Sequence, residues 1–451
     1  MDTDRERMEK RREELRQQRV ADTPVDKPGG GVGAVRRKPL ARCVFSETVN
    51  LWTQLSGTPA EWKEQFDKSD RGDWAKWIRY DAVTMPSKYV LDTVSPDEVL
   101  PTRKLRTDKN EATRGDRSYE ENPLLAKTRN IVPGYKDKQL LSGELKTNAP
   151  TITDAATSVI LQETASREGW DLQQGYVDSA FLNGKYLSPD RRVFFRAPKG
   201  GLPAVPELGW GFIPEGTILQ AKNGVYGTND APLLWYDEHK DTILSLPGAS
   251  RSKLCPALFI FHDKDGNVIG LIGTHVDDDL IAGPKGFFAN QVGKLQNMHV
   301  DGKWQYVDDG FHHCGRYLRR NQNREITCSQ KDHTASIEKA PVNNERRKQK
   351  DSNLTPEERQ ALHSGYGQIQ WLVKSTRMDL AFQLAEARHV LMTKRAPCRT
   401  SSTSSRCLAT RRRTMSRSST GRLTWITQQW WRSTIRASPA WGRTKPRARR
   451  A

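Results

Sequence analysis

The stretch T-H-V-D-D-D-L-I-A-G, from Thr274 to Gly283, places three consecutive aspartates between two apolar flanks. The flank before it, V-I-G-L-I-G (Val268 to Gly273), is rich in β-branched residues and glycine, and L-I-A-G closes the stretch. Because Asp-Asp falls where a tight turn would join these flanks, the pattern predicts a β-hairpin.

Three adjacent carboxylates need an explanation. Two carboxylates about 4 Å apart repel by roughly 4 kcal/mol at an effective dielectric of 20. Either a solvated turn or a divalent cation can offset this repulsion. For an isolated Asp-Asp-Asp the solvated turn is the simpler explanation, since Asp is a common turn residue. Only the rest of the chain can favour the cation.

Composition excludes several classes of protein. A chain of 451 residues has room for two or three domains, and its six cysteines show neither a disulfide nor a zinc spacing. The first residues are too charged for a signal peptide, and no apolar run approaches the roughly 20 residues that span a membrane. We therefore expect a soluble intracellular protein, cytoplasmic or nuclear, with neither zinc nor a membrane partner.

The net charge of +19 is unevenly distributed. After Glu386 the chain contains no Asp or Glu, but 15 Arg and two Lys. The remainder is nearly neutral, so the overall charge alone does not indicate a nucleic-acid-binding domain.

The pattern along the chain predicts α+β architecture between two extensions. A helix is expected around Trp62, Trp74 and Trp77, a strand over Phe311 to Leu318, and an amphipathic helix through the segment from Ile369 to Phe382. Residues 1–42 are charged and Gly-rich, and we expect them to be disordered. The Arg-, Ser- and Trp-rich tail, 396–451, has no structural period. It is either disordered RNA-binding sequence or the product of an out-of-frame translation.

Four further segments accompany the aspartates. They are L-L-A-K-T-R-N-I-V-P-G-Y (Leu124 to Tyr135), G-W-D-L-Q-Q-G-Y-V-D-S-A-F-L-N-G (Gly169 to Gly184), I-L-Q-A-K-N-G-V-Y-G-T-N-D-A-P-L-L-W-Y (Ile218 to Tyr236) and W-L-V-K-S-T-R-M-D-L-A-F (Trp371 to Phe382). In this order, residues 60–390 resemble the reverse transcriptase of copia-type (Pseudoviridae-like) retrotransposon Pol polyproteins. The family's forms are K-A-R-L-V-A-K-G-F, D-V-x-x-A-F-L-x-G, L-Y-G-L-x-Q-A-P-x-x-W-Y, Y-V-D-D-x-L-I-A-G and T-R-P-D-I.

The resemblance implies a right-hand polymerase fold with fingers over about 60–150, a palm over about 150–300 and a thumb-like region over about 301–395. It also implies an RNA-directed DNA polymerase that uses an RNA or DNA template-primer and deoxynucleoside triphosphates. Such chemistry requires two cations, Mg²⁺ or Mn²⁺, between the attacking hydroxyl and the leaving pyrophosphate. Asp277 and Asp278 would be two of the metal ligands, while the family tolerates many residues at Asp279.

Other residues match nucleotide-binding positions of the family. Lys127 and Arg129 would hold the incoming triphosphate, and Phe181 would lie beneath its sugar. Gly227 belongs to the segment under the nascent base pair. Asp230 replaces a glutamine there, and we expect its carboxylate to repel the triphosphate. Two further departures are His275 for Tyr and Met378 for Pro.

The most consequential departure is Tyr176, which stands where the family has its first catalytic aspartate. A phenol, with an ordinary pKa of about 10, is neutral at pH 7 and is a poor magnesium ligand. Asp178 is a possible substitute on the same strand face about 7 Å away. The short ligand distance of magnesium, about 2.1 Å, argues against such a displacement.

Two main hypotheses follow for the function. The first is a reverse transcriptase domain of a copia-type retrotransposon, in a degenerate copy with weak or no activity. The second is a non-catalytic nucleic-acid-binding remnant of the polyprotein. A calcium-stabilised or hydrolytic carboxylate site on an unrelated α+β fold is a third alternative, but no other acidic residues at ligand spacing support it.

Overall fold

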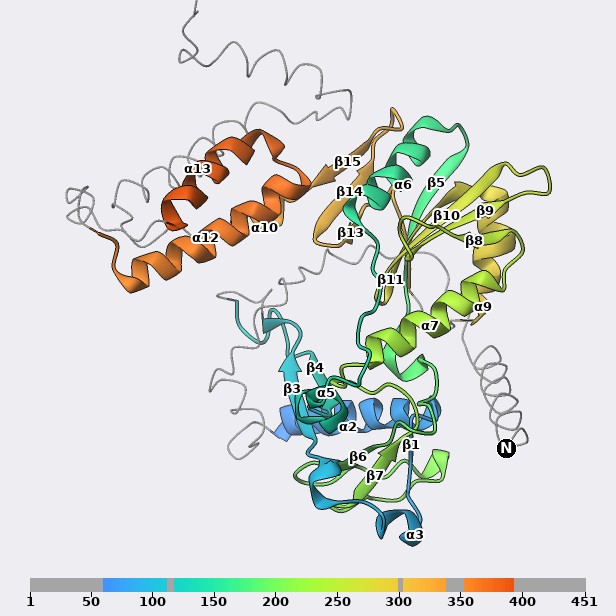
Figure 1. Ribbon diagram of the computed structural model, residues 1–451, viewed down its shortest axis with the longest axis vertical. Helices are drawn as coiled ribbons and strands as arrows, with labels where there is room; N and C mark the ends of the chain where they lie inside the picture. The colour runs from blue at the N-terminus through green and yellow to red at the C-terminus, as the bar shows by residue number, and fades with distance from the viewer. Residues whose placement is uncertain (1–59, 112–116, 299–302, 338–352, 393–451) are drawn as a thin grey trace, which may run out of the picture. The chain divides into compact units, whose positions relative to one another are not determined.

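The computed structural model describes residues 60–111, 117–298, 303–337 and 353–392 (Figure 1). These residues fall into two compact units. The first extends to Val307 and includes His313–Gly315, and the second contains Asp308–His312 and the chain from Arg316 onward. The two extensions predicted from the sequence lie outside the described residues. No helix among the described residues is long and apolar enough to cross a membrane.

The largest sheet described in the first unit has six strands, in the order β12-β5-β11-β10-β9-β8. The strands are β5 (Trp170–Tyr176), β8 (Ala249–Arg251), β9 (Leu258–His262), β10 (Val268–His275), β11 (Asp278–Pro284) and β12 (Lys303–Tyr306). All its pairings are antiparallel. The predicted hairpin is confirmed as β10 and β11, joined through Val276 and Asp277.

Helices pack on this sheet and bury its central strands (Figure 1). They are α6 (Asp154–Ser166), α7 (Ala231–Leu244), α8 (Lys285–Phe287) and α9 (Gly293–Met298), with a π-helical turn, η6 (Phe288–Val292), before α9. Ile243 of α7 packs with Ile272 and Ile281 of the hairpin in one buried cluster. The turn that carries Asp277 therefore joins two well-packed strands.

A second sheet of the first unit has four strands, in the order β1-β7-β6-β2. The strands are β1 (Val83–Thr84), β2 (Val99–Leu100), β6 (Val193–Arg196) and β7 (Ile218–Ala221). Strands β6 and β7 pair with β2 and β1, which precede residue 150, so this sheet contains strands from both sides of that residue.

Helix α2 (Ala60–Arg79) covers this sheet and a separate hairpin, β3 (Arg103–Asp108) and β4 (Ala126–Ile131). The helix predicted around the tryptophans is thus confirmed. Trp74 and Trp77 are fully buried, in the cluster that contains Phe195 and Leu219 of the sheet. Their helical spacing with Phe66 places one apolar stripe against the core.

Short elements connect these parts. They are α3 (Lys88–Leu91), η2 (Pro96–Glu98), η3 (Gly134–Lys136), α5 (Lys138–Leu141), η4 (Ala180–Asn183) and η5 (Pro206–Leu208). Ser179, at φ 55°, ends the extended chain before η4 and turns it away from the strand direction.

The second unit contains a three-stranded sheet and a helical part. The strands are β13 (Phe311–His313), β14 (Arg316–Arg320) and β15 (Ile326–Ser329), and the helices are α10 (Lys331–Ser336), α12 (Pro356–Ser375), η7 (Met378–Leu380) and α13 (Ala381–Met392). The single strand predicted over Phe311 to Leu318 is wrong, because Cys314 and Gly315 at positive φ turn the chain between two strands. The amphipathic helix is likewise interrupted after Ser375.

A thumb-like region is expected from about residue 301 onward. Strand β12 pairs with β5 and so belongs to the six-stranded sheet of the first unit. The division lies between Val307 and Asp308.

Candidate functional site

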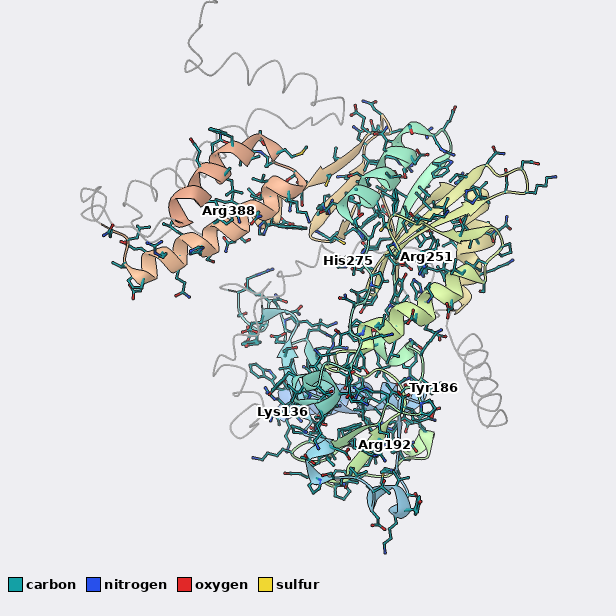
Figure 2. The ribbon with its side chains drawn as sticks, in the orientation of Figure 1. Lys136, Tyr186, Arg192, Arg251, His275 and Arg388 are labelled. Atoms are coloured by element: carbon teal, nitrogen blue, oxygen red, sulfur yellow. The ribbon has the colours of Figure 1, made fainter. Side chains whose placement is uncertain are left out.

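The predicted catalytic hairpin brings three polar residues into one row across the sheet. His275 on β10 is the direct partner of Asp278 on β11, and Asp278 is the direct partner of Tyr176 on β5. Directly opposed residues of antiparallel strands project from the same face, with Cβ atoms about 4.5–5.5 Å apart. Tyr176 therefore stands beside Asp278, at the end of the sheet where His275 is labelled in Figure 2.

Asp277 lies in the turn itself. Its carbonyl oxygen accepts a hydrogen bond from the Val177 N–H at 3.0 Å, so the residue after Tyr176 is fastened to the turn. Asp277 is half-buried and Asp278 is buried. The two carboxylates expected to ligate metal are thus held at one end of the sheet, next to Tyr176.

Asp178 does not lie on the strand face assumed from the sequence. Strand β5 ends at Tyr176, and Asp178 lies in the following turn, where its carboxylate accepts a hydrogen bond from Lys76 Nζ of α2. Burial would raise the pKa of Asp178, but the bond from Lys76 and the charges of Lys76 and Lys127 keep it below its usual value. In the structure, Asp178 is the ionised partner of Lys76 and is not part of strand β5.

Lys127 and Arg129 project from the same face of β4, two residues apart. Partial burial lowers the pKa of the Lys127 ammonium, and nearby positive charges lower it further. These charges belong to Lys76, Lys109 and Arg129, and the charge of Asp178 opposes them. A concentration of cations around one carboxylate is suited to binding a polyanion.

The alternate residues of β4 fasten the strand to α2. Asp70 accepts a hydrogen bond from Thr128 Oγ1 at 2.7 Å, and Asp73 accepts two from Asn130, from its backbone N–H and from Nδ2, both at 2.9 Å. Burial raises the pKa of Asp73 to about 6, although the Asn130 hydrogen bonds and the charges of Lys127 and Arg129 oppose this shift.

Phe181 and Arg129 both lie next to the ring of Tyr226. The Phe181 ring centroid is 6.3 Å from that of Tyr226, and the Arg129 guanidinium carbon lies 5.4 Å from the Tyr226 centroid. Burial raises the pKa of Tyr226 to about 12, so its phenol stays neutral at physiological pH. Arg129 can therefore use the Tyr226 ring as a cation–π surface.

Gly227 allows two backbone segments to meet. A Cβ at Gly227, which has φ 97°, would stand 2.4 Å from the Val132 carbonyl oxygen. The Gly227 carbonyl oxygen accepts a hydrogen bond from the Gly134 N–H at 3.0 Å. The residue therefore fixes the loop against the end of β4, next to the nucleotide-binding residues predicted from the sequence.

Asp230 is buried in an ion-pair network. Arg191 Nε donates to Asp230 Oδ2 at 2.8 Å, and Arg191 Nη2 donates to Asp137 Oδ2 at 2.5 Å. All three side chains are at most 7% exposed. Asp230 is therefore not an isolated carboxylate, although it shares the single Arg191 guanidinium with Asp137. Its expected repulsion of a triphosphate stays a prediction. No local sequence pattern indicated the Arg191 partner, which is 39 residues away.

The residues at the hairpin do not fit a complete two-metal site. Asp277 and Asp278 supply two carboxylates, and Tyr176 occupies the adjacent position in the row. Among the described residues, no three His, Cys, Asp or Glu side chains gather into a group that could hold a metal ion. Magnesium is commonly bound through one or two carboxylates plus substrate phosphates, so the pair is suited to one cation at most.

Sequence analysis missed several members of the site. Lys76 and Asp73 come from a helix that carries none of the quoted motifs, and Tyr226 matches the tyrosine of L-Y-G-L but was given no role. Asp279 was treated as unconstrained, but its carboxylate is buried against His239 of α7. Only the apolar spacing that predicted α2 could have placed Lys76 and Asp73 on one element.

The chain is similar over part of its length to a transposon protein. No protein-family model matches it. A protein of Saccharomyces cerevisiae (strain ATCC 204508 / S288c), named for transposon Ty5-1, is 30% identical over 164 residues, which cover 35% of this chain and 46% of the yeast protein. The chain therefore matches less than half of the length of this curated relative.

Two solved structures show weaker likeness. The foamy viral protease-reverse transcriptase in complex with double-stranded DNA gives a TM-score of 0.35 at 9% identity, covering 63% of this chain and 41% of the viral chain. Telomerase from Candida albicans, in complex with the TWJ fragment of telomeric RNA, gives 0.34 at 9% identity, covering 77% and 65%. These scores are too low to assign a role to any residue of this chain.

Proposed function

We propose that the chain is the reverse transcriptase domain of a copia-type retrotransposon Pol polyprotein, in a copy that has lost one catalytic carboxylate. The observation that carries the proposal is the direct pairing of Tyr176 with Asp278. The order of the five sequence motifs and the partial similarity to the Ty5-1 protein support the same assignment.

The proposed right-hand architecture follows from this assignment. The six-stranded sheet with α6 and α7 is the palm, and α2, the β3–β4 hairpin and the four-stranded sheet form the fingers. The second unit takes the place of the thumb. Strands β6 and β7 then extend the fingers beyond the boundary expected from the sequence.

The cluster of Lys76 on α2 with Lys127 and Arg129 on β4 is the proposed site for a deoxynucleoside triphosphate. Lys127 and Arg129 offer fixed positive charge, and an Arg guanidinium can bind a phosphate through two parallel hydrogen bonds. Lys76 is a third candidate donor, since its ammonium already holds the carboxylate of Asp178. A bound phosphate would compete with Asp178 for this ammonium.

The proposed partner of the sheet end is an RNA or DNA template-primer. In the intact reaction, cations activate the primer 3′-hydroxyl and stabilise the leaving pyrophosphate. The two aspartates and Tyr176 do not form the complete carboxylate set for this task. We therefore propose that the chain extends a primer negligibly with Mg²⁺ or Mn²⁺.

The alternative function is a nucleic-acid-binding remnant that never regains activity. Tyr176 favours this alternative as well. The ion pair between Lys76 and Asp178 also favours it, because Asp178 already occupies an ammonium group that is proposed to bind phosphate. Restoring the lost aspartate distinguishes the two, because only a polymerase with an otherwise intact site would respond.

Equilibrium binding of a fluorescent deoxynucleoside triphosphate to the full chain tests the nucleotide site. Lys127→Ala and Arg129→Ala should each weaken binding by about tenfold at low salt, where charge interactions are least screened. Asp178→Asn should strengthen binding, because it releases Lys76. Lys185→Ala is the matched control, since Lys185 is an exposed lysine paired with Asp241. If the Lys127 and control variants bound equally, the proposed site would be wrong.

A further inference from the structure

The third aspartate of the run faces away from the other two. Asp279 is the direct partner of Thr274 and of Gly175, whereas Asp278 is the partner of His275 and Tyr176. Successive residues of a strand project from opposite faces, so Asp279 lies on the face opposite to Asp278. Its carboxylate is not in the row of the proposed metal site.

Asp279 pairs with a buried histidine of α7. His239 Nε2 lies 3.1 and 2.9 Å from the two carboxylate oxygens of Asp279, and its N–H donates to them. The two side chains are 1% and 3% exposed. Both side chains are shielded from water, so loss of their contact costs free energy.

A second residue of α7 contacts the same hairpin one helical turn earlier. Trp235 Nε1 donates to the Val276 carbonyl oxygen at 2.5 Å. The Trp235 ring also stacks on His239, with centroids 4.9 Å apart and planes inclined by 17°. The spacing i, i+4 puts both side chains on one helix face, from which they reach the turn and strand β11.

The turn that Trp235 contacts has an unfavourable backbone conformation. Val276 has φ 60°, a left-handed value that is costly for a β-branched residue and for which tight hairpin turns normally use glycine. Such a conformation persists only where the surroundings impose it. The bond from Trp235 to Val276 and the bond from Val177 to Asp277 are two such restraints.

We propose that Trp235 and His239 are positioning residues that clamp the hairpin, and that Asp279 belongs to this clamp instead of to a cation site. The clamp fixes the turn, and with it the end of the sheet at which Asp277 and Asp278 stand. The importance of those two aspartates rests on the proposed polymerase function. The clamp itself rests only on the contacts between α7 and the hairpin.

Amide hydrogen exchange of the full chain tests the clamp without nucleotide or metal. His239→Leu and Asp279→Leu each remove one half of a buried hydrogen-bonded pair. We therefore expect the hairpin amides and the Val177 amide to exchange about tenfold faster or more. The double variant His239→Leu with Asp279→Leu replaces the pair by apolar groups and should return exchange close to the original rate. Trp235→Phe should also accelerate exchange at the turn while keeping an aromatic ring.

Asp241→Asn is the matched control on the same helix, because it affects only the surface ion pairs with Lys185 and Lys240. It should leave hairpin exchange unchanged. Unchanged exchange rates of the hairpin amides in both single variants would overturn the clamp. So would an equal acceleration of the β3–β4 amides, because the effect would then not be specific to the hairpin. A double variant whose hairpin amides exchange as fast as those of the single variants would also overturn it. If one of the single variants fails to fold, Trp235→Phe still tests the clamp. Unchanged exchange of the turn amides in Trp235→Phe would then overturn it. Failure of the polymerase proposal would leave all of these rates unaffected.

Discussion

At the scale of single residues, Gly227 gives the sharpest steric prediction. Gly227→Ala would place a Cβ 2.4 Å from the Val132 carbonyl oxygen at a residue with φ 97°. Both the contact and the left-handed conformation oppose a side chain, so the variant should lower the free energy of unfolding by about 2 kcal/mol or more. Urea denaturation followed by tryptophan fluorescence measures the loss.

Gly211→Ala is the control for this substitution. An added Cβ at Gly211 meets no atom within 4 Å, and its φ lies outside the left-handed region. Its stability should change by no more than about 0.5 kcal/mol. Equal losses in the two variants would show that close approach at Gly227 is not what the fold requires.

Local spacing predicted some residues of the site and not others. The register of Y-V-D-S-A-F anticipated a tyrosine near the aspartate pair, and Tyr176 is the direct partner of Asp278. Asp178 was misplaced, because the strand period was extended past the residue where the strand ends. The Arg191 partner of Asp230 and the His239 partner of Asp279 could not be predicted, since tertiary packing alone brings them together.

At the scale of elements, the contact between α2 and β4 predicts a pH dependence. Burial raises the pKa of Asp73 from 3.8 to about 6 in the folded chain. Folding therefore favours the protonated carboxyl, and the resulting stabilisation is fully present below about pH 3.8 and is lost as pH rises through 6. Relative to Asp73→Asn, the free energy of unfolding of the original chain should fall by about 2 kcal/mol between pH 4 and pH 7.

Urea denaturation of both proteins at several pH values measures this difference, and subtraction of the Asp73→Asn curve removes the other titrating groups. The hydrogen bonds from Asn130 can still be accepted by an asparagine oxygen, so the variant should fold. Parallel stability curves for the two proteins would mean that Asp73 does not titrate in this range.

Helices and strands with a regular spacing of apolar residues could be predicted from the sequence. Elements whose ends depend on the backbone conformation of one residue could not. Helix α2 and the β10–β11 hairpin follow from apolar spacing and β-branched runs flanking a turn. Strands β13 and β14 were merged, because nothing in the apolar pattern shows that Cys314 adopts a left-handed conformation. The pairing of β6 and β7 with β1 and β2 depends on contacts distant in sequence.

At the scale of the whole molecule, the charge distribution predicts which segment would bind the proposed nucleic-acid partner. The 15 Arg and two Lys after Glu386 face no acidic residue in that stretch, most of which lies outside the described residues. Deleting 396–451 should remove most of the affinity for a primer-template duplex and reduce its salt dependence, because fewer phosphate contacts release counterions. Titrations of the full and truncated chains at several salt concentrations measure both effects. Equal affinity would place the binding in the folded units instead.

Primer extension on an RNA template, with Mg²⁺ or Mn²⁺, is the most direct measurement of the proposed loss at Tyr176. We predict negligible nucleotide incorporation by the original chain and at least about a 100-fold increase in Tyr176→Asp, because a metal ligand contributes several kcal/mol and each tenfold change in rate corresponds to about 1.4 kcal/mol. Asp178→Asn in the Tyr176→Asp background should not abolish that gain, since Asp178 pairs with Lys76. Robust incorporation by the original chain that disappears in Asp178→Asn would contradict the loss of the catalytic carboxylate at Tyr176.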